Sequence, residues 1–124
     1  MIRIKCLLAV LCLAAFALTA ALLSVLGIGG GIITGEEALE IFSQNPGTVL
    51  LDVRDTNERG AGRIRGSVVI PLRELESRLD ELDKNAVIIV YCKGGARSGS
   101  AYRLLTASGF HNVYDMRNAD NWPG

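Results

Sequence analysis

One short segment of the chain brings together residue types that do chemistry with sulfur or with anions. It follows an apolar, β-branched stretch and reads Cys92-Lys93-Gly94-Gly95-Ala96-Arg97-Ser98. Adjacent glycines allow backbone angles that other residues avoid, so successive N–H groups are able to point inward at one spot. The segment therefore predicts a backbone-lined cradle for an anion, with a thiol at its start.

Cys92 is predicted to be the reactive group of this cradle. The N-terminus of a helix just after the glycines adds about half a positive charge, and Lys93 and Arg97 add further positive charge. These charges favour thiolate over thiol and predict a pKa below the usual value of about 8.5. Ser98 is expected to cap the helix, with a hydrogen bond to a sulfur anion as the less favoured alternative. The alternative is a buried, inert cysteine followed by an ordinary strand-to-helix turn.

The elements that would position this segment alternate between β-branched runs and helical patterns, which is typical of parallel strands joined by crossover helices. The pattern predicts strands at residues 32–34, 49–51, 68–70, 87–91 and 113–114. Helices are expected at residues 36–42, with a Thr34 and Glu37 capping box, around Leu72, Leu75 and Leu79, and at residues 98–108. We therefore predict an α/β domain, an open parallel sheet of about five short strands with helices on both faces.

On this sheet, Cys92 is expected to be the first residue after the strand at 87–91. Ligands of open parallel sheets bind beyond the carboxyl ends of the strands, so the position itself favours a functional role. Asp52 and Arg54 follow the strand at 49–51 in the same way. Because a strand-end ion pair is normally held by hydrogen bonds, we predict that these two residues support the structure rather than react.

Residues 1–31 differ from the rest of the chain. After Arg3 and Lys5 no charged residue occurs before Glu36, and residues 6–26 are densely apolar. A bilayer-spanning helix needs about 20 such residues, whereas the apolar core of a cleaved signal peptide has about 7 to 15. We favour an uncleaved membrane anchor, with a cleaved signal peptide as the alternative. In both cases the basic N-terminus predicts that the rest of the chain is exported.

The glycine-rich residues 27–31 are expected to form a flexible joint between this segment and the domain. The domain itself is then predicted to occupy residues 32–124. A domain of this size is too small to cover a helix that is apolar all round, which argues against a buried N-terminal helix.

The composition argues against several other kinds of site. The chain has 13 basic and 13 acidic residues. It therefore has no excess of positive charge, and we predict that it does not bind nucleic acid. One histidine and three cysteines show no metal-ligand spacing, and we predict neither a structural metal nor another cofactor. Cys6 and Cys12 lie in the apolar segment, which leaves Cys92 without a disulfide partner in the domain.

The chain from Ile32 to Trp122 resembles a single rhodanese-like domain. The first signature of that family resembles residues 51–54 (Leu-Asp-Val-Arg), Glu58, Gly62, Ile64 and Gly66. Its active-site loop resembles residues 91–98, and its closing strand resembles residues 109–114. The loop counts six residues from Cys92 to Arg97, the length associated with sulfur transfer in this family, whereas its phosphatases carry a seven-residue loop. Departures from the family pattern are Arg63, Arg65 and the Asn118-Ala119 pair.

The resemblance implies a sulfurtransferase that works through a persulfide on Cys92. Its donor would be thiosulfate or a persulfide, and its acceptor a thiol, cyanide or a protein. The substrate-binding residues would be Lys93, Gly94, Gly95, Ala96, Arg97 and Ser98, with the two cations holding the donor's oxygens. The apolar N-terminus makes the chain similar to exported, periplasmic sulfurtransferases of phage-shock type.

Two other functions remain as alternatives. A sulfur carrier or interaction module would accept sulfur on Cys92 and pass it to a partner, with little turnover of small molecules. A phosphatase or arsenate reductase would use the same fold, and the short loop argues against that activity.

Overall fold

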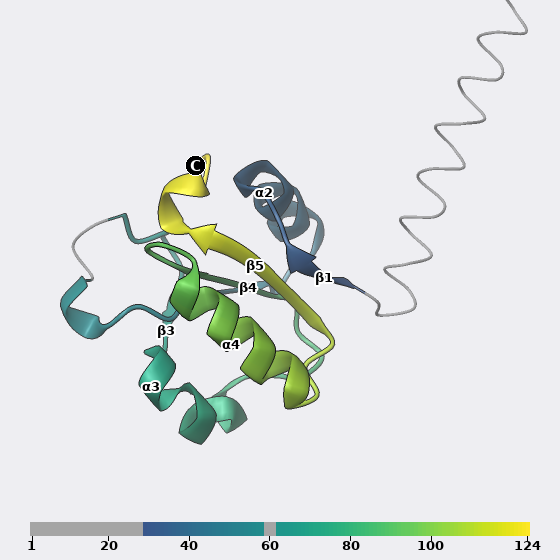
Figure 1. Cartoon of the computed structure of the whole chain (residues 1–124). Helices are drawn as coiled ribbons and strands as arrows, with labels where there is room; N and C mark the ends of the chain where they lie inside the picture. The colour runs from purple at the N-terminus through teal and green to yellow at the C-terminus, as the bar shows by residue number, and fades with distance from the viewer. Residues whose placement is uncertain (1–28, 59–61) are drawn as a thin grey trace, which may run out of the picture.

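The computed structural model describes residues 29–58 and 62–124 (Figure 1). These residues form a five-stranded parallel sheet with the strand order β1-β5-β4-β2-β3. The strands are β1 (Gly29–Ile32), β2 (Val49–Asp52), β3 (Val68–Val69), β4 (Ile88–Cys92) and β5 (Asn112–Asn118). The helices are α2 (Gly35–Gln44), α3 (Leu72–Leu75) and α4 (Ala96–Ala107), and the 3-10 turns are η1 (Thr56–Glu58), η2 (Glu76–Glu81) and η3 (Ala119–Asn121). The open parallel sheet predicted from the sequence is therefore confirmed.

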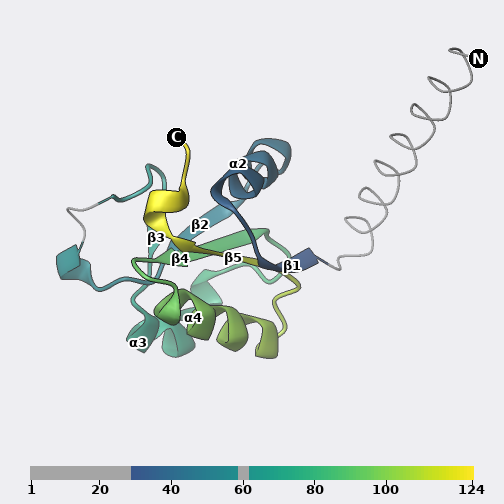
Figure 2. The same cartoon turned by 45° about the horizontal axis from the view of Figure 1, so that its top comes forward.

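Helices lie on both faces of this sheet, as expected. Helix α2 lies on one face and helices α3 and α4 lie on the other, as the two views show (Figures 1 and 2). Each face has its own hydrophobic core, and the larger one packs Leu51, Val90, Leu105 and Val113 together under α4. The smaller core, on the α2 side, includes Ala38, Leu50, Ile89, Tyr91 and Met116.

Strand β4 is the central element, and it ends at Cys92. All five of its residues are buried, and β2 and β5 pair with its two edges. A strand buried on both faces needs the continuous apolar run that residues 88–91 supply. Cys92 is the last residue of β4 rather than the first residue after it, so the strand's hydrogen bonds extend to the thiol-bearing residue.

Several predicted boundaries were wrong. Strand β1 begins at Gly29, so three glycines assigned to the flexible joint are paired with β5 instead. Helix α4 begins at Ala96 rather than at residue 98, and β5 runs to Asn118 rather than ending at residue 114. Strand β3 is shorter than the predicted strand at residues 68–70 and lies at the sheet edge, where Val68 is 43% exposed.

The predicted start of α2 is confirmed. The Thr34 side chain accepts a hydrogen bond from the Glu37 backbone N–H at 3.2 Å. The Glu37 carboxylate accepts in return from the Thr34 backbone N–H at 2.7 Å. Such a reciprocal pair satisfies two N–H groups that a helix start otherwise leaves without partners.

The predicted apolar anchor at residues 6–26 lies outside the described residues. Within residues 29–58 and 62–124, no helix is both long and apolar enough to cross a bilayer.

Candidate active site

Two backbone N–H groups converge on the sulfur of Cys92. Gly95 donates a hydrogen bond to the Sγ at 2.9 Å, and Ser98 donates one at 3.4 Å. Both donors belong to the turn that carries the chain from the end of β4 into α4. The Cys92 residue is only 1% exposed, so these hydrogen bonds act on a sulfur with little water around it. The predicted backbone cradle is therefore present in the structure.

Gly95 makes this turn possible. It is the N-cap residue of α4 and has a φ of +95°, a left-handed conformation that residues with a side chain rarely adopt. A Cβ at this position would also lie 3.3 Å from the Cβ of Arg117. Gly94 has neither constraint, since it shows no positive φ and a Cβ there would have no neighbour within 4 Å. Of the two glycines singled out from the sequence, the geometry requires Gly95.

The pKa of the Cys92 thiol is lowered from its ordinary value. Burial alone raises the pKa of this thiol, because it disfavours the charged form. Hydrogen bonds from the Ser98 side chain and from the backbone N–H groups of Ser98, Gly95 and Gly94 lower it, and together they outweigh burial. The lowered pKa predicted from the sequence is confirmed, with hydrogen bonds to the thiolate as its cause.

Ser98 has the role that was the alternative, a hydrogen bond to the Cys92 sulfur, and not the capping role that was favoured. The N-cap of α4 is Gly95, and Ser98 lies buried in the first turn of the helix. Its hydroxyl has one proton to donate, which is shared between the Gly95 carbonyl, 3.2 Å away, and the Cys92 sulfur, where it lowers the pKa of the thiol. The expected cap is wrong because α4 starts two residues earlier than the sequence pattern indicated.

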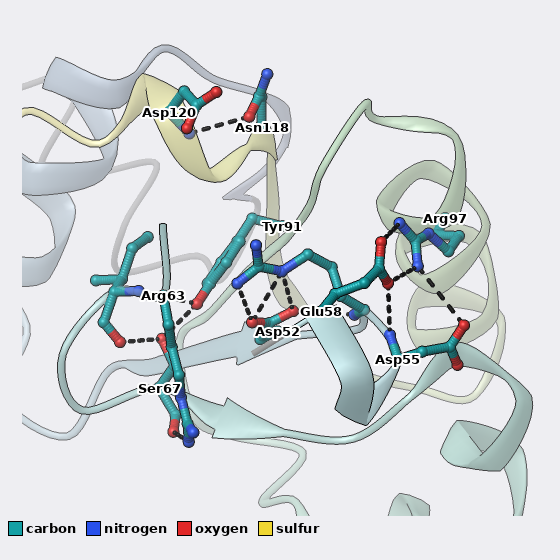
Figure 3. A network of polar contacts seen from close by, with 11 residues as sticks. Asp52, Asp55, Glu58, Arg63, Ser67, Tyr91, Arg97, Asn118 and Asp120 are labelled. Carbon is teal, nitrogen blue, oxygen red and sulfur yellow. Dashed lines mark hydrogen bonds and ion pairs between the residues drawn. The ribbon is translucent and has the colours of Figure 1, made fainter. Parts of the chain in front are cut away.

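Arg97 points toward the connection between β2 and β3 (Figure 3). Its Nη2 lies 2.9 Å from the Oε1 of Glu58, and its Nη1 lies 2.5 Å from the Oε2. This two-pronged contact holds the pKa of the Glu58 carboxyl at about 2, mainly through the hydrogen bonds from Arg97 and then through one from the Asp55 backbone. The Arg97 guanidinium, which was predicted to bind the donor's oxygens, is thus paired with the Glu58 carboxylate of the chain itself.

The remaining predicted loop residues line the outer side of the turn. Lys93, Gly94 and Ala96 are exposed, and Lys93 therefore presents its cation to solvent beside the buried sulfur. The structure brings together all seven residues of the predicted segment.

Asp52 and Arg54 form the predicted ion pair at the end of β2. The Nη2 of Arg54 lies 2.7 Å from the Oδ2 of Asp52, and the Arg54 backbone N–H donates to the Oδ1 at 2.9 Å. Both residues are buried, at 2% and 3% exposure, and the guanidinium lies 5.7 Å from the centre of the Tyr91 ring. Hydrogen bonding to Asp52 raises the pKa of Arg54. These contacts fix the chain beside β4, next to the residue that precedes Cys92.

Two residues at this edge of the sheet were not singled out from the sequence as site residues. Glu58 was noted only as part of a signature, and Arg117 was not noted at all. Arg117 has a φ of 68°, and it covers Gly95 with its side-chain stem. Its carbonyl accepts a weak hydrogen bond from Ser98 at 3.5 Å. Asn118, one of the departures from the family pattern, is extended with a φ of −114°, and the left-handed residue is Arg117 just before it.

The family model described as "Rhodanese-like domain" matches residues 34–119. The chain belongs to the rhodanese-like domain family. The structural comparison agrees: a rhodanese-like domain protein from Staphylococcus aureus is 25% identical, with a TM-score of 0.66, over 73% of this chain and 89% of that one. The predicted family and the rhodanese-like fold are thereby confirmed.

Curated relatives of this rhodanese-like chain include proteins named for sulfur chemistry. The putative sulfur carrier protein YrkF of Bacillus subtilis is 38% identical over 65% of this chain. The thiosulfate sulfurtransferase GlpE of Pseudomonas entomophila is 32% identical over 68% of this chain and 75% of the relative. The chain spans 60% and 46% of the lengths of two Bacillus subtilis relatives that it matches, the second of them YrkF. Sulfurtransferases among the relatives support sulfur transfer as a general activity of proteins similar to this chain.

Proposed function

We propose that this rhodanese-like chain is a sulfurtransferase that carries sulfane sulfur as a persulfide on Cys92. The observation that carries the proposal is the pair of N–H donors on Sγ, from Gly95 at 2.9 Å and Ser98 at 3.4 Å. They stabilise a thiolate, and a thiolate is the form of cysteine that attacks sulfur. The donor is thiosulfate or a persulfide, and the acceptor is a thiol, cyanide or a protein.

The first half-reaction loads the sulfur. With thiosulfate, the Cys92 thiolate attacks the outer sulfur, a new S–S bond forms, and the old S–S bond breaks with its electron pair leaving on sulfite. With an organic persulfide, the same attack releases the donor's thiolate. Positive charge and N–H groups fixed around the sulfur stabilise the anion in the transition state, and no separate base is needed once the thiol is ionised.

The second half-reaction unloads the sulfur. A thiolate or cyanide attacks the outer sulfur of the Cys92 persulfide, and the bond between the two sulfurs breaks. The electron pair returns to the Sγ, which regenerates the thiolate held by the N–H groups of Gly95 and Ser98. The product is a persulfide of the acceptor or thiocyanate.

Mass spectrometry of the full chain, purified in detergent, tests this proposal. After reaction with thiosulfate or with a persulfide, Cys92 is expected to gain one sulfur atom that cyanide removes. The Cys92→Ser variant is the control and is expected to gain none. A folded wild-type chain that gains sulfur from neither donor would show that the proposed chemistry is wrong.

A second candidate is a sulfur carrier that serves a protein partner. Its support is the similarity to YrkF, a putative sulfur carrier protein of which the alignment covers 46%. A carrier would be persulfidated when isolated from cells, yet would turn over thiosulfate and cyanide slowly. The two functions are distinguished by two measurements. One is the steady-state rate with thiosulfate and cyanide, and the other is the rate of sulfur transfer to a persulfide-accepting protein.

We also propose that residues 6–26 export and anchor the chain, so that the domain acts outside the cytoplasm. The support is the run of uncharged, apolar residues behind two basic ones. A fusion of alkaline phosphatase after residue 124 is expected to be active in a bacterial host and to sediment with membranes. An active fusion that is fully soluble and shortened at its N-terminus would instead support the cleaved signal peptide.

A further inference from the structure

The carboxylate of Glu58 accepts hydrogen bonds from both terminal nitrogens of Arg97. The distances are 2.9 Å from Nη2 to Oε1 and 2.5 Å from Nη1 to Oε2. Glu58 comes from η1, after β2, and Arg97 comes from the first turn of α4, so the contact joins these two elements (Figure 3). A negative charge therefore lies next to the cation that the loop itself provides.

A second carboxylate reinforces this charge. The Oδ2 of Asp55 lies 3.9 Å from the Nη1 of Arg97, and the Asp55 backbone N–H donates to the Oε2 of Glu58 at 2.9 Å. Asp55 also pairs with Arg73. Hydrogen bonds from Arg97 and the Asp55 backbone hold the pKa of Glu58 at about 2, so its carboxylate stays ionised in any working buffer. Arg97 thus faces two carboxylates.

This arrangement affects the candidate donors unequally. Thiosulfate is a dianion, and a persulfide made from an uncharged thiol carries one negative charge or none. Coulomb energy scales with the product of the charges, so a fixed carboxylate near the loop repels thiosulfate more than it repels the persulfide. The guanidinium that would offset this repulsion is already bound by Glu58 and must be shared with any oxyanion that enters.

We propose that Glu58 determines donor specificity by disfavouring dianionic donors such as thiosulfate relative to persulfides of low charge. This inference rests on the sulfur-transfer function proposed above. Glu58 acts through Arg97 and through its own field, without contact to the reacting sulfur. The physiological donor of this chain is then a persulfide, of a small thiol or of a protein.

The Glu58→Gln variant tests the inference because it removes the charge and keeps an oxygen that accepts from Arg97. Kinetics of the full chain in detergent are measured with thiosulfate and with a persulfide of an uncharged thiol, with cyanide as acceptor. The KM for thiosulfate is expected to fall about threefold to tenfold, the range expected for one partly screened charge. The kcat with both donors and the KM for the persulfide are expected to change less than about twofold, because an uncharged or singly charged donor is repelled less.

Two variants control this result. Glu81→Gln removes the carboxylate of a similar two-pronged contact, in which Arg78 lies 2.6 Å and 2.9 Å from the Glu81 oxygens within η2. It is expected to leave the kcat/KM values for both donors unchanged, since its partner Arg78 lies in η2 and not in the Cys92 loop. Glu58→Asp keeps the charge and shortens the side chain, and it is expected to keep the wild-type ratio of the two kcat/KM values.

The possible results distinguish failure of the Glu58 specificity role from failure of the proposed sulfurtransferase function. If Glu58→Gln lowers the kcat/KM values for both donors equally, or leaves the ratio of these two values unchanged, Glu58 only holds Arg97 in place. The specificity role is then refuted. The same conclusion follows if Glu58→Asp shifts the ratio as much as Glu58→Gln does. If the wild-type chain transfers sulfur from neither donor, the proposed function itself fails. Should Glu58→Gln not fold, Asp55→Asn is expected to shift the ratio in the same direction by a smaller factor.

Discussion

The backbone N–H of Gly95 donates a hydrogen bond to the Sγ of Cys92 at 2.9 Å, and the same glycine has a left-handed φ of +95°. Gly95 therefore affects both the conformation of the turn and the protonation of the Cys92 thiol. A change at either residue is expected to affect both.

Gly95→Ala is expected to destabilise the protein and to raise the pKa of Cys92. A non-glycine residue in the left-handed conformation costs about 1 to 2 kcal/mol, and the new Cβ would lie 3.3 Å from the Cβ of Arg117. Urea denaturation measures the first effect, and the pH dependence of Cys92 alkylation measures the second. Gly94→Ala is the matched control, because nothing lies within 4 Å of a Cβ there. Equal effects of the two replacements would contradict this assignment.

Ser98→Ala is expected to raise the pKa of Cys92 toward its ordinary value. Among the groups that lower this pKa, the Ser98 side chain has the largest effect. The variant keeps the backbone N–H donors of Gly95 and Ser98, so alkylation should shift to higher pH without losing its single-step profile. Ser100→Ala, which removes a hydroxyl bonded to Ala96 on the same helix, serves as the control. An unchanged midpoint would assign the lowered pKa to the backbone alone.

The stability of the folded protein is expected to rise with pH through the titration of Cys92. The folded pKa lies below the ordinary value that the thiol has in the unfolded chain, so the unfolded chain binds the proton more tightly. The thiolate's contribution is fully present above the unfolded pKa and is lost as the pH falls through the folded pKa. The free energy of unfolding, measured in urea at several pH values for wild type and Cys92→Ser, reports this contribution as their difference. A difference that grows as the pH falls would disprove it.

Asp52→Ala is expected to destabilise the protein by about 3 to 5 kcal/mol. It leaves the buried Arg54 guanidinium without the carboxylate that lies 2.7 Å away. Thermal or urea denaturation measures the loss. Glu81→Ala breaks an exposed ion pair with Arg78 and is expected to change stability little. Similar losses in the two variants would show that burial of the pair is not the reason for its strength.

Thr34→Ala is expected to cost about 1 kcal/mol of stability, the usual value for a lost N-cap. The replacement removes the oxygen that accepts from the Glu37 N–H at 3.2 Å. Urea denaturation measures the change, and Thr34→Ser, which keeps the hydroxyl, is expected to retain most of the stability. A loss of the same size in both variants would assign the effect to the methyl group instead.

The strands with apolar side chains were predictable from the sequence, whereas β1 was not. Residues 88–91 are apolar without interruption because both faces of β4 are covered, and this pattern is visible in the chain itself. Strand β1 contains three glycines, and glycine carries no pattern that separates a strand from a flexible joint. Its extended conformation comes from backbone hydrogen bonds to β5, a partner far along the chain.

The cradle around Cys92 was predictable because its donors lie within six positions of the cysteine. The Arg97–Glu58 contact was not, since the two residues are 39 positions apart and the chain offers 13 acidic residues. No local pattern indicates which carboxylate meets which guanidinium. The left-handed Arg117 was also missed, because arginine gives no signal for a conformation that glycine normally takes.

Cys92 belongs to the central strand, and this placement affects how fast its thiol is oxidised during the lifetime of the protein. Strand β4 is paired on both edges, so its amides are expected to open only when the whole domain unfolds. The thiol is therefore screened from bulky oxidants for as long as the fold persists. Small donors that fit the loop reach the sulfur, while oxidation by bulky oxidants is expected to track the unfolded fraction of the population.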